Sequence, residues 1–109
     1  MDLNHTGTYY RDWVKSQPFD IGIATKDALN PLTKPENQMN LSAAAKQSAF
    51  QNNEDSCSNA CLMRCMPLAV WGQGLNEQDF KKICDADCEF THSNQTCKDI
   101  CFIYNYAIK

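Results

Sequence analysis

The most apolar stretch of the chain is SNACLMRCMPLAVWG, residues 58–72, and its pattern indicates a helix. Ser58 can cap the start of this helix, and Gly72 can end it. Pro67 lies inside the stretch and removes one backbone hydrogen bond, so we expect a kink there. Arg64 interrupts the apolar residues, which are fewer than the roughly eighteen that a membrane helix needs. The stretch therefore predicts a kinked helix with no transmembrane role.

Helical patterns also precede and follow this stretch. We expect an aromatic helical face at Tyr9, Tyr10, Trp13 and Val14, a helix capped by Asp20 and running through Leu29, an alanine-rich helix from Met39 to Phe50, a helix opened by Asn76, and a last helix capped by Ser93 or Thr96. No segment has the pattern of a strand. The fold class is therefore predicted to be all-α, with about five or six helices.

Length and charge limit the range of functions. The chain has 109 residues and a net charge of −3, which fits one small domain. We expect a flexible N-terminus over residues 1–7 and a single helical domain over residues 8–109. No basic block is present, so a nucleic-acid surface is not expected. The N-terminal residues form no hydrophobic segment, so classical secretion is not expected either.

The seven cysteines are the unusual feature of the composition. Six of them form pairs with a spacing of four: Cys57–Cys61, Cys84–Cys88 and Cys97–Cys101. If the last two helices form an antiparallel hairpin, residues whose numbers add up to the same total face each other. This rule pairs Cys84 with Cys101 and Cys88 with Cys97. Three interpretations of these four side chains stay open: two disulfides, inert buried thiols, or a four-thiolate zinc site. Cys57, Cys61 and Cys65 remain, so at least one thiol is unpaired within the chain.

The pattern of Cys84 to Cys101 resembles the twin Cys-x-x-x-Cys helical hairpins of small mitochondrial intermembrane-space proteins, although its eight-residue spacer is shorter. Such proteins are oxidised without a cleaved secretory signal. The resemblance therefore implies a location in the mitochondrial intermembrane space, with the cytoplasm as the alternative.

Three motifs resemble the ADP-ribosylglycohydrolase family: residues 58–72, CEFTHSNQT at residues 88–96, and YYRDWVKSQPFDIGIATKDAL at residues 9–29. They occur in the family's order and together span about residues 8 to 108. The resemblance implies the middle part of an all-α, orthogonally packed helical bundle. It places Ser58, Asn59, Met63 and Arg64 on the ligand-binding helix, and Thr91, His92 and Asn94 in a turn motif.

Simpler roles compete with ligand binding at three of these positions. Asn59 can cap a helix, Arg64 can bind a carboxylate or a loop carbonyl, and His92 can serve the turn alone. The family cleaves ADP-ribose with two magnesium ions, held by Thr-Asp-Asp and Asp-x-Asp segments that we do not find here. The nearest acidic clusters are Glu54-Asp55 and Asp85-x-Asp87, and the second spacing directs its side chains to different faces of a helix.

These departures favour a pseudoenzyme. The family's Gly and Ser after Asn59 are here Ala60 and Cys61, which add bulk where a ligand would approach. We therefore expect no catalytic residues, metal or cofactor, and a non-catalytic structural or accessory subunit of a larger, mitochondrial membrane-associated protein assembly. Its expected interface anchors are Tyr9, Trp13, Phe19, Tyr104 and Tyr106. The alternative is a fragment of an active, magnesium-dependent ADP-ribosylglycohydrolase.

Overall fold

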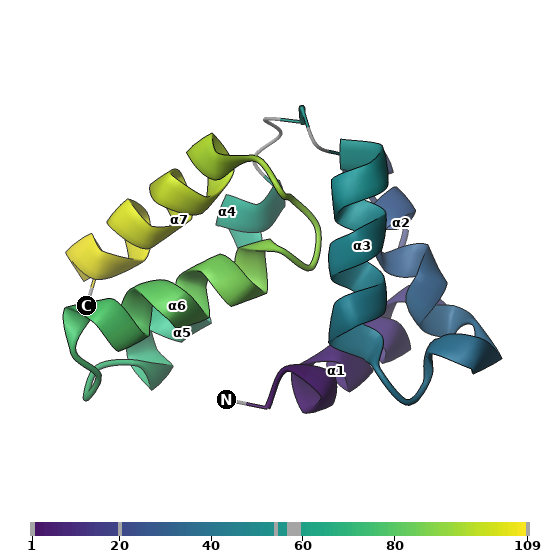
Figure 1. Ribbon diagram of the computed structural model, residues 1–109, viewed down its shortest axis with the longest axis horizontal. Helices are drawn as coiled ribbons and strands as arrows, with labels where there is room; N and C mark the ends of the chain where they lie inside the picture. Colours follow the sequence, from purple (N-terminus) through teal and green to yellow (C-terminus); the bar gives the residue numbers. More distant parts are fainter. Residues whose placement is uncertain (1, 20, 54, 57–59, 109) are drawn as a thin grey trace.

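The computed structural model describes residues 2–19, 21–53, 55–56 and 60–108. The elements are α1 (Leu3–Lys15), α2 (Ile23–Leu29), η1 (Asn30–Thr33), η2 (Pro35–Asn37), α3 (Leu41–Asn53), α4 (Ala60–Arg64), α5 (Pro67–Trp71), α6 (Glu77–Cys88) and α7 (Gln95–Ile108). Figure 1 shows α1, α2 and α3 packed together in one half, and α4 to α7 in the other. Over the described ranges every element is helical, which confirms the predicted fold class.

The N-terminal residues differ from the expectation of a poorly anchored segment. Asp2 caps α1, because its Oδ1 accepts hydrogen bonds from the backbone N–H groups of Asn4 at 3.0 Å and His5 at 3.1 Å. Gly7 is buried against α3, where an added Cβ would lie 2.8 Å from Cβ of Leu41. Residues 3–7 are therefore part of the first helix. Their polar composition did not indicate that Asp2 would cap the helix or that Gly7 would pack closely against α3.

The stretch that opened the sequence analysis forms two short helices, α4 and α5. Pro67 is the first residue of α5 and Gly72 caps its end, so the predicted stop occurs, whereas the kink expected at Pro67 is a break between two helices. Asn76 caps α6 as expected, with its Oδ1 accepting from the Asp79 N–H at 2.8 Å. The last helix differs, because Asn94 Oδ1 accepts from the Thr96 N–H at 2.8 Å, a capping role that we expected of Ser93 or Thr96. The expected caps Asp20 and Ser58 lie outside the described residues.

The turn between α6 and α7 joins the two halves. Phe90, from this turn, packs in the first hydrophobic core with Leu29, Leu32, Leu41 and Ala45. The Asn53 amide at the end of α3 donates hydrogen bonds to the carbonyl oxygens of Ala24 at 2.8 Å and Thr91 at 3.0 Å. These contacts hold the turn inside the protein rather than on its surface.

Glu89 adds an electrostatic link between the halves. Its carboxylate oxygens contact Lys46 of α3 at 2.9 Å and Lys98 of α7 at 3.0 Å. The carboxylate therefore bridges two helices that do not follow each other in the chain.

The second core is built from thiols: Cys61, Cys65, Cys88, Cys97 and Cys101. Cys61, Cys65, Cys84, Cys88 and Cys101 are free and buried, so the predicted disulfides Cys84–Cys101 and Cys88–Cys97 are not formed in the structure. The Sγ atoms of Cys61, Cys88 and Cys101 gather instead, while Cys97 Sγ donates to the Ser56 carbonyl at 3.4 Å. The pairing predicted from residue numbers considered α6 and α7 alone. In the structure α4 also contacts α7, and this contact adds Cys61 to the cluster. Cys57 lies outside the described residues.

No helix in the described part of the chain is long and apolar enough to cross a membrane.

Candidate functional site

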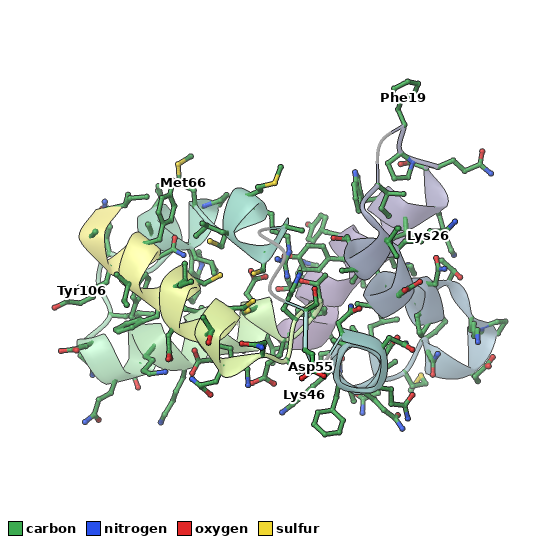
Figure 2. The ribbon with its side chains drawn as sticks, turned by 90° about the horizontal axis from the view of Figure 1, so that it is seen from above. Phe19, Lys26, Lys46, Asp55, Met66 and Tyr106 are labelled. Carbon is green, nitrogen blue, oxygen red and sulfur yellow. The ribbon has the colours of Figure 1, made fainter. Side chains whose placement is uncertain are left out.

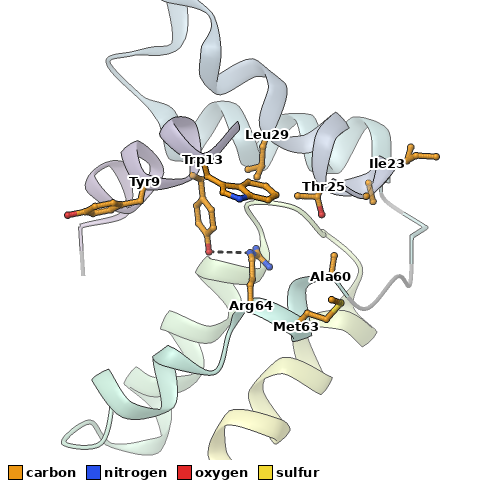
Figure 3. A pocket seen from close by; sticks show the side chains of 11 residues that line it. Tyr9, Trp13, Ile23, Thr25, Leu29, Ala60, Met63 and Arg64 are labelled. Atoms are coloured by element: carbon orange, nitrogen blue, oxygen red, sulfur yellow. Dashed lines mark hydrogen bonds between the residues drawn. The ribbon is translucent and has the colours of Figure 1, made fainter. Parts of the chain in front are cut away.

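A cavity of about 910 Å³ lies between α1, α2 and α4, as Figure 3 shows. Tyr9 and Trp13 approach it from α1, Ile23 from α2, and Met63 and Arg64 from α4. Apolar side chains form most of its lining, and Arg64 supplies a cationic group. This size and this mixture are typical of small-molecule pockets.

Two residues of the cavity lining, Tyr10 and Arg64, form a hydrogen-bonded network with Asp87, which does not line the cavity. The Tyr10 hydroxyl donates to Asp87 Oδ1 at 2.6 Å and accepts from Arg64 Nε at 3.2 Å. Arg64 Nη2 donates to the backbone carbonyl of Asp87 at 2.8 Å, and its guanidinium carbon lies 5.3 Å from the centroid of the Tyr10 ring. The network therefore joins α1, α4 and α6, which lie far apart in the sequence.

Burial and neighbouring charges shift the pKa values of Tyr10 and Arg64 in this network. Burial raises the pKa of Tyr10 well above its usual value, the nearby Asp87 carboxylate adds to the increase, and Arg64 opposes it. Burial by itself would lower the pKa of Arg64, but Tyr10 and Asp87 raise it above the usual value. At neutral pH the network therefore contains a neutral phenol donor and a charged guanidinium. Arg64 Nη1 is buried and has no hydrogen-bond partner among the described residues.

The structure separates the residues that the resemblance assigned to ligand binding. Met63 and Arg64 line the cavity, while Ser58 and Asn59 lie outside the described residues. Thr91 and His92 are fully buried in the turn and do not line the cavity. Arg64 binds the backbone carbonyl of Asp87, within α6, where the simpler role expected a carboxylate or a loop carbonyl.

The Asp85-x-Asp87 spacing also behaves as predicted. Asp87 is buried and binds Tyr10, whereas Asp85 pairs with Lys81 at 2.9 Å within α6. The two carboxylates therefore point to different surroundings. Sequence reasoning placed Tyr10 only on an aromatic face, and the pattern carried no signal for its bond to a carboxylate 77 positions away.

The thiol cluster is a second candidate site. The ligand atoms of Cys61, Cys88 and Cys101 all lie within 4.8 Å of one another, and each side chain is at most 2% exposed. Hydrogen bonds from Cys101 and Cys88 lower the pKa of Cys61 strongly, against the effect of burial, and His92 adds to the lowering. His92 Nδ1 lies 2.8 Å from Thr91 Oγ1.

Two other cysteines show contrasting behaviour. A hydrogen bond from Cys101 lowers the pKa of Cys65 to about 7, and Asn105, which donates to its Sγ at 3.0 Å, contributes to this shift. Burial raises the pKa of Cys84 to about 12, so Cys84 stays a thiol at neutral pH. The cysteines of the second core are therefore not chemically equivalent.

Comparison with known proteins gives one match. The family model described as ADP-ribosylglycohydrolase matches residues 1–109. No curated protein and no solved structure matches the chain significantly.

Proposed function

The chain belongs to the ADP-ribosylglycohydrolase family, and from this premise we propose that it acts as a non-catalytic structural or accessory subunit of a larger protein assembly. The observation that carries the proposal is the number of large apolar side chains on its surface. Large apolar side chains that gather on a protein surface mark sites of protein–protein contact. A chain of this size also buries a limited share of its own surface, so a partner can supply the missing contacts.

The five expected interface anchors are all exposed. Tyr104 and Trp13 are 41% and 42% exposed, and Tyr106, Tyr9 and Phe19 are more so. Figure 2 shows Tyr106 at the left end of the molecule and Phe19 projecting from the upper edge of the other half. Aromatic residues are enriched among the side chains that dominate binding at interfaces, which supports a docking role for these positions.

A second group of exposed apolar residues lies on α5 and α7, two helices that contact each other. Its members are Val70 and Trp71 of α5, and Ile100, Ile103, Tyr104, Tyr106 and Ile108 of α7. A helix that carries apolar residues on its outer face normally packs against another element. These positions therefore support a partner on this side of the protein.

The Asp87 carboxylate supports a structural rather than a catalytic use of the scaffold. Its Oδ1 accepts from Tyr10 in a buried setting, and Asp85 is held by Lys81. Magnesium requires oxygen ligands arranged close to an octahedron. In the described part of the chain the convergent group of metal-ligating side chains consists of thiols, which do not suit magnesium.

Site-specific photo-crosslinking tests the proposed docking role. A photoreactive residue replaces Ile103 on α7 in the native cell, and the matched control replaces Lys82, a polar exposed residue of α6. We expect crosslinked partners of defined mass at Ile103 and none at Lys82. Equal crosslinking at both positions, or a protein that purifies alone and releases ADP-ribose with magnesium, would contradict the proposal.

The alternative is a fragment of an active ADP-ribosylglycohydrolase, and the cavity beside Arg64 favours it. A charged guanidinium with a buried, unpartnered Nη1 among the described residues suits an anionic group such as a phosphate. Calorimetry with ADP-ribose tests this function. Binding that is lost in Arg64→Gln supports a retained ligand site, whereas release of ADP-ribose from a modified protein would establish hydrolysis. A location in the mitochondrial intermembrane space stays a prediction, which subcellular fractionation tests.

A further inference from the structure

We propose that Cys61, Cys88 and Cys101 bind a zinc ion as thiolates. The site lies in the second core, shares no residue with the lining of the cavity and is independent of the proposed docking role. It differs from the four-thiolate site considered from the sequence, because it includes a cysteine of α4 and excludes Cys84 and Cys97.

The three sulfur atoms come from three helices that enclose one point. Cys61 lies on α4, Cys88 ends α6 and Cys101 lies on α7, and their Sγ atoms are all within 4.8 Å of one another. In a tetrahedral zinc site each sulfur is about 2.3 Å from the metal, which puts the sulfur atoms about 3.8 Å apart. Rotamer adjustments and a helix shift of less than about 1 Å would therefore close the three thiolates on the ion.

His92 belongs to the surroundings of the three thiols. It is fully buried in the turn between α6 and α7, and Cys88 Sγ donates to its backbone carbonyl at 3.7 Å. Its Nδ1 lies 2.8 Å from Thr91 Oγ1, so the ring is held within the turn. Cys65 is not one of the converging sulfur atoms, and its Sγ donates to the Leu62 carbonyl at 3.3 Å and accepts from Asn105.

The ligand chemistry selects zinc over hard cations. Thiolate and imidazole ligands suit zinc, whereas magnesium and calcium require oxygen. Each of the three thiols releases one proton as its Zn–S bond forms. Three thiolates and Zn²⁺ leave one negative charge, and the Arg64 guanidinium interacts electrostatically with Cys88. No change of oxidation state occurs.

A bound zinc ion would explain why the short helix α4 is stable in its position. α4 has only five residues, and a helix of that length is unstable on its own in water. A Zn–S bond from Cys61 would tie α4 to α6 and α7. The metal would then supply the crosslinks that small domains commonly need.

Metal titration of the reduced full chain under anaerobic conditions tests the site. We expect one tightly bound zinc per chain and, with Co²⁺, the thiolate charge-transfer and d–d bands of a tetrahedral site. Cys88→Ser and Cys101→Ser should lower the zinc affinity by more than the roughly 10–100-fold that loss of an outer-shell partner costs. The matched control is Cys84→Ser, which changes an equally buried thiol one turn earlier on α6 and should leave the affinity unchanged.

A measurement on the wild-type chain tests the site even if the variants fail to fold. Alkylation of the native protein, read by peptide mass spectrometry, should show zinc-dependent protection of Cys61, Cys88 and Cys101, and no zinc dependence at Cys84. The proposal is overturned if the reduced chain takes up no stoichiometric zinc, or if Cys84→Ser loses the metal as Cys88→Ser does. A disulfide between two of the three cysteines in the protein isolated from cells would overturn it as well.

Discussion

Removing the Tyr10 hydroxyl should destabilise the protein strongly, because one oxygen atom serves two buried partners. Tyr10→Phe keeps the ring, whose centroid lies 4.9 Å from that of Phe90, and deletes the bonds to Asp87 Oδ1 and Arg64 Nε. Hydrogen bonds to charged groups contribute about 1.5–3 kcal/mol each, and the 3.2 Å bond to Arg64 is the weaker of the two. We therefore expect a loss of about 2–4 kcal/mol in the free energy of unfolding, or roughly 10–20 °C in Tm for a domain of this size.

Chemical denaturation of Tyr10→Phe beside Tyr9→Phe measures this loss. Tyr9 is the neighbouring residue and 67% exposed, so its variant should stay within about 0.5 kcal/mol of the wild type. In a double-mutant cycle, Tyr10→Phe should cost at least about 1 kcal/mol less when Asp87 is already asparagine. If the Tyr10 and Tyr9 variants have the same stability, the network does not hold the two halves together and the reasoning fails.

Three further predictions concern other parts of the fold. Gly72→Ala should cost about 1–3 kcal/mol by urea denaturation, because an added Cβ would lie 2.6 Å from two atoms of the buried Phe80 ring, whereas Gly74→Ala, with open space around it, should be neutral. Asn76→Ala should cost about 1 kcal/mol, measured in the same way, because α6 loses its cap. Burial alone would raise the pKa of Glu89, but hydrogen bonds from its two lysine partners lower it below the usual value. The wild type should therefore lose stability as the pH falls below about 4.3 through the lower folded-state pKa, while Glu89→Gln shows a flatter acid limb in thermal melts.

Each of these predictions has a result that contradicts it. If Gly72→Ala is as stable as Gly74→Ala, the Phe80 ring can move aside at little cost. An unchanged denaturation midpoint for Asn76→Ala would mean that the side-chain cap contributes nothing to α6. Identical acid limbs for the wild type and Glu89→Gln would show that the two lysine contacts do not stabilise the folded carboxylate.

Local sequence determined most of the helical architecture. Pro67 and Gly72 mark where α5 begins and ends, and Asn76 marks the start of α6, as the residue types predicted. These features depend on backbone groups only a few residues away, so their physics is contained in a short window. The same holds for the divergent directions of Asp85 and Asp87, which follow from two residues of helical rotation.

Contacts between distant segments required the tertiary structure. The sequence alone predicted an all-α member of one family and a core rich in cysteine. It did not show that Tyr10 would bind Asp87. Nor did it show that Cys61 of α4 would approach Cys88 and Cys101, where two cysteine pairs between α6 and α7 were predicted. Periodicity records which face of a helix is apolar, whereas the partner of that face depends on how all the helices pack together at once. For this reason the residues showed that the chain would be helical, and only the packing of α4 against α6 and α7 decided which sulfur atoms meet.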